Sequence, residues 1–230
     1  MRKGGAMSIH AVIFDRDGVL TYFDFAPAVE LFRDLPQVPF EAVRQRWFSW
    51  SRAVGTPRTV EAERQFLAGF WDVLCDEWSL DGRARERFHQ FDYTRTIRPF
   101  ADARPTLLAL RERGLRVGVL SNFPMASLEA SLAAAGLGDL IDVACAAPVI
   151  GASKPEPAAY LHALAALGVS PDECLLVDDE EACVEGARAV GIHAFLLKRG
   201  GAAQGAGEAT LRGLDALSPV LEMRLLGVVS

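Results

Sequence analysis

Five short apolar runs, which alternate with helical patterns, restrict the folds that this 230-residue chain can adopt. Each run has the length and composition of a strand that is buried on both faces. The runs occupy residues 11–15, 116–122, 142–146, 174–179 and 194–198. The helical patterns close at glycines, a common helix stop signal, namely Gly114, Gly136, Gly168 and Gly191. This alternation predicts an α/β fold, a three-layer, Rossmann-like parallel sheet with helices on both faces.

Residues 22–98 break the alternation, because they show no convincing strand and read as three or four amphipathic helices. All four tryptophans lie in this segment, at Trp47, Trp50, Trp71 and Trp78. Their spacing favours a small helical core over a direct contact with substrate. We therefore expect residues 8–21 and 99–230 to form the α/β core, with residues 22–98 inserted as an α-helical cap domain.

The net charge of −6 and the lengths of the apolar runs argue against several classes of function. No run approaches the roughly 20 apolar residues that cross a bilayer, and the N-terminus does not read as a signal peptide. Recognition of nucleic acid normally needs a basic face. The four cysteines lack C-x-x-C spacing, so neither a zinc site nor a disulfide framework is indicated. We expect a cytoplasmic monomer or homodimer that binds a small molecule, and neither nucleic acid nor a membrane.

The first candidate for chemistry is the pair Asp15 and Asp17, which follows the first apolar run. Gly18 comes next and lets the chain turn sharply without a Cβ penalty. The carboxyl ends of parallel strands are where ligands bind in open α/β sheets. The D-x-D pair alone is weak evidence, because about one such pair is expected by chance among the chain's aspartates. A turn in which Asp17 binds only backbone amides is the structural alternative.

Three further polar residues follow later strands or loops. Ser121 and Asn122 end the second run, where a hydroxyl and an amide can donate to phosphate oxygens, although Asn122 also suits a helix N-cap. Lys154 precedes Pro155 at the expected start of a helix. Only three of the 24 basic residues are lysines, so this lysine favours a functional role over a place on the surface.

Asp178 and Asp179 close the fourth run. Adjacent side chains on a strand point in opposite directions, so only one of the two can aim directly into a shared site. Together with Asp15 and Asp17 it would form a cluster of carboxylates. Two such charges about 4 Å apart repel by roughly 4 kcal/mol at an effective dielectric constant near 20. A cluster of this kind needs a cation or raised pKa values, and Mg²⁺ is the cation that prefers oxygen ligands.

Four segments together resemble the haloacid dehalogenase superfamily, in the subfamily with a helical cap inserted after the first motif. The segments are FDRDGVLT, LSN, GASKPEPAAY and LLVDDEEACVEGARAVGI, and the resemblance covers residues 11–197. It implies a phosphohydrolase in which Asp15 attacks phosphorus, while Asp17 protonates the leaving oxygen and later activates water. The phosphoryl oxygens would bind Ser121 and Asn122, and Lys154 would stabilise the charge.

The resemblance also implies a Mg²⁺ cofactor, bound by Asp15, the main-chain carbonyl of Asp17 and Asp179. Asp178 would position Lys154 or a water on the metal. One departure is that many relatives carry an acid where this chain has Cys183 or Val184. Another is Arg16, which replaces an apolar residue between the two aspartates of the first motif, and whose side chain we expect to face away from the nucleophile.

Hydrolysis of a small phosphorylated metabolite is the leading function, and three alternatives remain. A phosphosugar mutase would share all four motifs. Haloacid dehalogenation is less favoured, because relatives that perform it do not use an acid at the position of Asp17. A non-catalytic binding role is less favoured because Asp15, Asp17 and Lys154 are all present. Cleavage of phosphonates through a cap lysine is excluded, because residues 22–98 contain no lysine. The loop at residues 56–59 is a candidate for substrate specificity.

Overall fold

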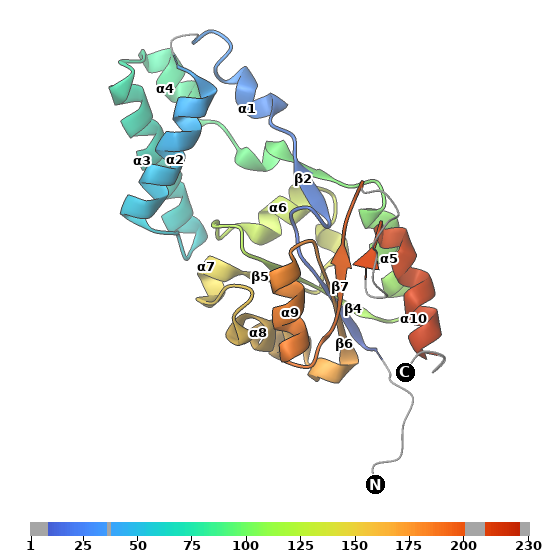
Figure 1. Cartoon of the computed structure of the whole chain (residues 1–230). Helices are drawn as coiled ribbons and strands as arrows, with labels where there is room; N and C mark the ends of the chain where they lie inside the picture. Colours follow the sequence, from blue (N-terminus) through green and yellow to red (C-terminus); the bar gives the residue numbers. More distant parts are fainter. Residues whose placement is uncertain (1–8, 36–37, 201–209, 226–230) are drawn as a thin grey trace.

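The computed structural model describes residues 9–35, 38–200 and 210–225. Its main sheet has six parallel strands in the order β5-β4-β1-β6-β7-β8 (Figure 1). These strands are β1 (Ala11–Phe14), β4 (Arg116–Ser121), β5 (Val143–Ala146), β6 (Cys174–Asp178), β7 (His193–Leu197) and β8 (Thr210–Leu211). The first five coincide with the five apolar runs, so the predicted parallel α/β sheet is confirmed.

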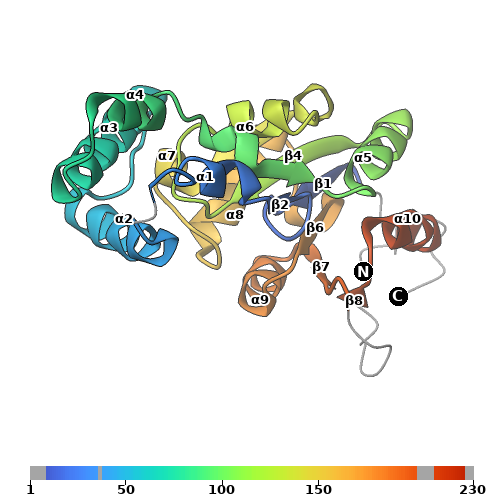
Figure 2. The ribbon, with the colours of Figure 1, turned by 90° about the horizontal axis from the view of Figure 1, so that it is seen from above.

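Alternate side chains of β1 build the two faces of the sheet. Val12 and Phe14 belong to one hydrophobic cluster, and Ala11 and Ile13 belong to another. The first cluster is covered by α5 (Ala103–Glu112), α6 (Leu128–Ala134) and α10 (Leu217–Leu225). The second is covered by α8 (Pro157–Leu167) and α9 (Glu181–Ala189). Figure 2 shows α9 on the opposite side of the strands from α5 and α6, so the three layers of the prediction are present.

Glycine-closed helices end where the pattern predicts. After α8, Gly168 adopts a left-handed conformation with φ 63°, which a residue without Cβ adopts readily. Short helical turns complete the core: η1 (Tyr93–Thr96), η2 (Gly138–Leu140), α7 (Ala147–Ile150), η3 (Pro171–Glu173) and η4 (Leu214–Ala216). Arg199, which follows β7, forms a bidentate ion pair with Asp102 at 2.9 Å, and Asp102 also accepts from Leu214 N. These bonds fasten the C-terminal elements to the start of α5.

The inserted segment contains α1 (Ala26–Glu30), α2 (Phe40–Val54), α3 (Val60–Glu77) and α4 (Gly82–His89). Figure 1 shows α2, α3 and α4 as a bundle set apart from the layers of the sheet. Trp71 is buried in a separate hydrophobic cluster, and the other three tryptophans pack against it. The predicted helical core is therefore present. None of the described helices is long and apolar enough to cross a membrane.

The expectation that residues 22–98 hold no strand is wrong at the two ends of the segment. β2 (Thr21–Phe23) and β3 (Ile97–Pro99) pair antiparallel where the chain leaves the core and returns to it. Three residues are too few to display the alternation of apolar and polar side chains that marks a strand. The hairpin-like pair brings the two crossings between core and helical segment side by side.

A buried carboxylate links the helical segment to the core. Glu63 on α3 is 4% exposed and accepts hydrogen bonds from the Ser127 backbone at 2.8 Å and hydroxyl at 2.5 Å. Ser127 immediately precedes α6, so the negative charge also lies at a helix N-terminus, where it is favourable. Tyr93 shares the Ser127 hydroxyl at 2.7 Å. This bridge fixes α3 against α6.

Candidate active site

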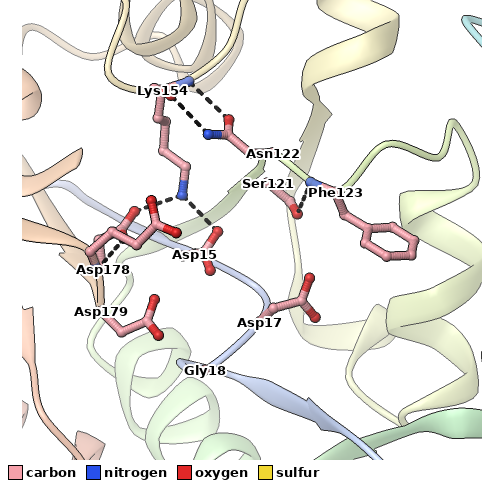
Figure 3. Close-up of a pocket in the computed structure, with 10 residues that line it drawn as sticks. Asp15, Asp17, Gly18, Ser121, Asn122, Phe123, Lys154, Asp178 and Asp179 are labelled. Atoms are coloured by element: carbon pink, nitrogen blue, oxygen red, sulfur yellow. Dashed lines mark hydrogen bonds and ion pairs between the residues drawn. The ribbon is translucent and has the colours of Figure 1, made fainter. Parts of the chain in front are cut away.

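The loop after β1 places Asp15 and Asp17 at the carboxyl end of the central strand (Figure 3). The Asp15 backbone donates to Val177 O at 2.9 Å, which extends the pairing of β1 with β6 by one residue. Gly18 then has φ 79°, a conformation that disfavours a side chain, and its N–H donates to Thr21 O. The turn therefore directs the first carboxylate into the sheet mouth and reverses the chain soon after the second.

Lys154 joins the carboxyl ends of the neighbouring strands β1 and β6. Its Nζ lies 2.6 Å from Asp15 Oδ1 and 2.6 Å from Asp178 Oδ2, and the residue is only 5% exposed. The Asn122 carboxamide holds the backbone of this lysine at both polar groups, because Nδ2 donates to Lys154 O at 2.8 Å and Oδ1 accepts from Lys154 N at 2.9 Å. Four residues from four separate segments are thus bound to one another.

Burial dominates the electrostatics of this cluster. It raises the pKa of Asp15 to about 7, an effect that Lys154 opposes and the neighbouring Asp178 reinforces. Burial also works against the charged form of Lys154, but the two aspartates outweigh it and raise the pKa of the lysine. The ammonium is therefore permanently charged, whereas the Asp15 carboxylate needs further positive charge to stay ionised at neutral pH.

All seven predicted site residues line one cavity of about 360 Å³: Asp15, Asp17, Ser121, Asn122, Lys154, Asp178 and Asp179. Ser121 is buried, and its hydroxyl oxygen accepts from Phe123 N at 3.1 Å, which leaves the hydroxyl hydrogen to donate. Asn122 Nδ2 carries a second hydrogen beyond the one bound to Lys154 O. The cavity thus offers neutral donors beside an ammonium group, which suits an anion.

The two neighbouring aspartates take different directions, as adjacent positions on a strand require. Asp178 is 1% exposed and binds Lys154, whereas Asp179 turns to the loop after β1, where a Cβ on Gly18 would lie 2.1 Å from its Oδ2. Burial, with the charge of Asp178, raises the pKa of Asp179. Asp179 therefore lies on the same side of the cavity as the Asp15–Gly18 loop (Figure 3).

The donor atoms at this end of the cavity fit a hard cation. Carboxylates of Asp15 and Asp179, with the main-chain carbonyl of Asp17, are the oxygen ligands that Mg²⁺ prefers. Within the described ranges no three side chains of His, Cys, Asp or Glu are arranged to hold a metal. The candidate set has two carboxylates and a backbone oxygen, so it does not depend on such a triad. Positive charge here would also favour ionised Asp15.

Arg16 is the residue whose role the sequence did not reveal. It is fully buried, with Nε donating to Asp17 Oδ1 at 3.0 Å, Nη2 to Oδ2 at 2.7 Å and Nη1 to Ser131 Oγ at 3.0 Å. Its guanidinium lies 4.0 Å from the centre of the Phe123 ring. The only signal was the unusual arginine between two aspartates. The sequence did not indicate that this arginine forms two hydrogen bonds to the carboxylate of Asp17.

Cys183 does not supply the acidic group that many relatives are expected to carry near this position. It is 1% exposed, and burial raises the pKa of its thiol to about 12, so it is neutral at physiological pH. It is absent from the residues that line the cavity, whereas Glu180 is among them.

The loop at residues 56–59 reaches the neighbourhood of the site. Thr56 and Arg58 line a separate cavity of about 270 Å³ that shares Asn122 with the cavity described above. The loop therefore stays a candidate for substrate specificity.

Comparisons with known proteins show which sequences and folds this chain resembles. A family model described as haloacid dehalogenase-like hydrolase matches residues 9–191. A protein of Mycobacterium tuberculosis that is named a phosphatase is 40% identical over 94% of this chain and 98% of its own length. The crystal structure of a HAD phosphatase from Thermococcus onnurineus is 27% identical, with a TM-score of 0.61 over 93% of this chain and 98% of that chain. A 2-haloacid dehalogenase from Pseudomonas syringae shares the fold at 24% identity, with a TM-score of 0.65 over 93% of this chain and 98% of that chain.

Proposed function

The chain belongs to the haloacid dehalogenase-like hydrolase family, and on this premise we propose that it hydrolyses small phosphate monoesters through a phosphoryl group carried on Asp15. The observation that carries the proposal is the buried contact of 2.6 Å between Lys154 Nζ and Asp15 Oδ1, in a cavity whose hydrogen-bond donors suit an anion. The phosphatase name of the relative at 40% identity supports the same reaction class.

In the first step a carboxylate oxygen of Asp15 attacks phosphorus, and the bond from phosphorus to the ester oxygen breaks. Lys154 binds Oδ1 and stabilises the ionised form of this carboxyl group. Asp17 lines the same cavity and donates a proton to the departing oxygen, so an alcohol leaves rather than an alkoxide. Arg16 holds the Asp17 carboxyl group in place through two hydrogen bonds.

The phosphoryl oxygens are bound by Ser121 and by the second hydrogen of Asn122 Nδ2, while the Lys154 ammonium faces the growing negative charge. Asp178 keeps Lys154 in position. Asp15, the Asp17 carbonyl and Asp179 would hold Mg²⁺, which would supply positive charge that offsets the clustered carboxylates and the phosphoryl group.

In the second step Asp17 accepts a proton from a water molecule, which attacks phosphorus and releases inorganic phosphate and the Asp15 carboxylate. One residue thus acts as acid and then as base, which requires its carboxyl group to remain beside the phosphoryl site throughout. The rigid Arg16 side chain provides that constraint.

The proposal is tested by measuring phosphate release from sugar phosphates, nucleotides and glycolytic intermediates with Mg²⁺, for the native protein and for Asp15→Asn. We expect release that depends on Mg²⁺ and falls to background in the variant. Asp17→Asn is expected to slow turnover by a factor of about 10²–10⁴, the usual contribution of general acid–base catalysis. No release from any ester by a folded protein would refute the hydrolase function.

Dehalogenation is the second candidate, because a dehalogenase shares the fold. Chloride release from 2-chloropropionate, in parallel with phosphate release, separates the two reactions. A mutase would instead convert a phosphosugar into its isomer, faster in the presence of a sugar bisphosphate.

A further inference from the structure

A third cavity, of about 430 Å³, lies between the inserted helices and the core. Its size falls within the range of roughly 300–1,000 Å³ that is usual for small-molecule sites. Aromatic and apolar side chains from both parts of the chain form its walls, among them Phe23, Trp47, Phe48, Phe70, Phe123 and Met125. This cavity is therefore built by the insertion and the sheet domain together.

Several polar side chains on its wall already have partners within the protein. Arg44 makes two hydrogen bonds to Glu41, at 2.8 and 2.7 Å. Ser127 gives its own hydroxyl hydrogen to a carboxylate, so the Tyr93 hydroxyl on the wall donates to Ser127 at 2.7 Å. Thr96 donates to the Tyr93 carbonyl at 2.7 Å. A ligand with many hydroxyls would replace few of its hydrogen bonds to water here, whereas an apolar group would lose none.

Phe123 lies where the catalytic cavity and the apolar cavity meet, because this residue lines both. Figure 3 shows this ring on the side of the catalytic cavity where Asp17 lies, away from Lys154 and Asp178. An ester oxygen that takes a proton from Asp17 therefore directs its organic group toward Phe123. The apolar cavity begins there.

Arg16 packs against the aromatic rings where the two cavities meet. Its guanidinium lies 4.0 Å from the centre of the Phe123 ring and 5.7 Å from that of Phe23, and both rings belong to the wall of the apolar cavity. The same side chain holds Asp17. One buried arginine thus sets the position of the acid and of the first two rings beside it.

The free protein leaves part of this wall uncovered. Phe48 is 51% exposed and Phe25 is 54% exposed, and both line the cavity. Covering aromatic surface of this kind with an apolar group of a ligand is favourable, because it removes apolar area from water.

We propose that this cavity binds the apolar organic group of the substrate, so that the preferred substrates are phosphate monoesters of aromatic or long-chain alcohols rather than of sugars. The proposal rests on the phosphohydrolase function proposed above and narrows its substrate class.

The test compares two primary alkyl esters of similar intrinsic reactivity, 2-phenylethyl phosphate and glycerol 1-phosphate, with glucose 6-phosphate as a sugar reference. We expect kcat/KM to be at least tenfold higher for 2-phenylethyl phosphate than for either other ester. In Phe48→Asp the ratio of kcat/KM for 2-phenylethyl phosphate to that for glycerol 1-phosphate is expected to fall about tenfold. The matched control is Val54→Asp, which puts the same charge on the same helix at a residue that is 53% exposed and not on the cavity wall. Its ratio is expected to stay at the native value.

A binding measurement is independent of turnover. Trp47 and Trp71 line the cavity, so 2-phenylethyl phosphate is expected to change tryptophan emission in Asp15→Asn, and glycerol 1-phosphate to leave it unchanged. Phosphate release that favours glycerol or glucose esters, with the same ratio in Phe48→Asp, would overturn the apolar site and leave the hydrolase standing. Release from none of the three esters, with no change of emission, would overturn the site as well, and the broader ester screen would then decide the hydrolase function separately.

Discussion

Replacing Lys154 with methionine keeps most of the length of the side chain and removes its charge. The native ammonium is 5% exposed and lies 2.6 Å from two carboxylates, so the variant leaves both carboxylates buried without their cation. Removing one partner of a buried ion pair typically costs about 3–5 kcal/mol. The buried carboxylate can instead take up a proton, which costs about 4 kcal/mol at pH 7 for a group with an ordinary pKa near 3.9. This cost sets a similar upper limit on the loss of stability. We expect the free energy of unfolding to fall by about 3–4 kcal/mol at pH 7.

The loss depends on pH with a definite sign. Asp15 contributes little of the loss at pH 7, because burial already raises its pKa to about 7. Most of the loss comes from Asp178, which is 1% exposed and is left without its ammonium partner. In the variant the uncompensated carboxyl has a pKa above its value in the unfolded chain, so the native state binds more protons than the unfolded state. Its stability therefore rises as pH falls, by up to about 1.4 kcal/mol per pH unit. The gap to the native protein is expected to narrow by about 2 kcal/mol between pH 7 and pH 5.

Urea unfolding at pH 7 and pH 5, followed by circular dichroism, measures both quantities. Lys198→Met is the matched control, because Lys198 is an exposed lysine that donates only to the Asp179 carbonyl. The control is expected to change stability by less than about 1 kcal/mol. A Lys154→Met protein as stable as the control at pH 7, or a loss of stability that is equal at both pH values, would refute this reasoning.

Three further predictions concern the loop, the bridge to the inserted helices and the C-terminal fastening. Gly18 has φ 79°, and Gly18→Ala would place a methyl group 2.1 Å from Asp179 Oδ2. The Mg²⁺ concentration for half-maximal activity is therefore expected to rise at least about tenfold. An unchanged dependence on Mg²⁺ would contradict the assigned ligands. Glu63→Gln is expected to lower the free energy of unfolding by about 1–3 kcal/mol. The control Glu61→Gln, which is exposed on the same helix, is expected to lower it by less than about 0.5 kcal/mol. Equal losses in the two variants would contradict the role of Glu63. Burial raises the pKa of Asp102, but the hydrogen bonds from Arg199 and from Leu214 N, together with the charge of Arg199, outweigh it and lower this pKa overall. The stabilising effect of Asp102 is therefore present above about pH 4 and fades below that. Asp102→Asn should therefore lose about 1–3 kcal/mol at pH 7 in urea unfolding and less at pH 3, and a constant loss would contradict the assignment.

The parts of the fold that could be predicted are those in which one local pattern decides the outcome. A strand buried on both faces must be apolar throughout, so the five runs stand out in the sequence. Parallel strands bring their carboxyl ends to one edge of the sheet, which is why Asp15, Ser121 and Asp178 could be assigned to one site. The alternation expected for a strand likewise predicted different directions for Asp178, the last residue of β6, and Asp179, the residue after it.

The parts that could not be predicted depend on contacts between distant residues. Alternation ends with β1, so the direction of Arg16 follows from the turn at Gly18 and from Ser131, 115 residues further along the chain. The carboxamide of Asn122 binds both backbone groups of Lys154, an interaction that no spacing in the sequence indicates. The apolar cavity draws its walls from helices and loops whose aromatic residues read, one by one, as ordinary core.

The central claim, that Asp15 carries the phosphoryl group, is tested most directly by trapping the intermediate. The protein would be mixed with an ester labelled with ³²P in its phosphoryl group, quenched in acid during turnover and digested for peptide mapping. We expect the label on the peptide that contains Asp15, and none in Asp15→Asn. Label on a peptide without Asp15, or phosphate release by Asp15→Asn at the native rate, would contradict the mechanism.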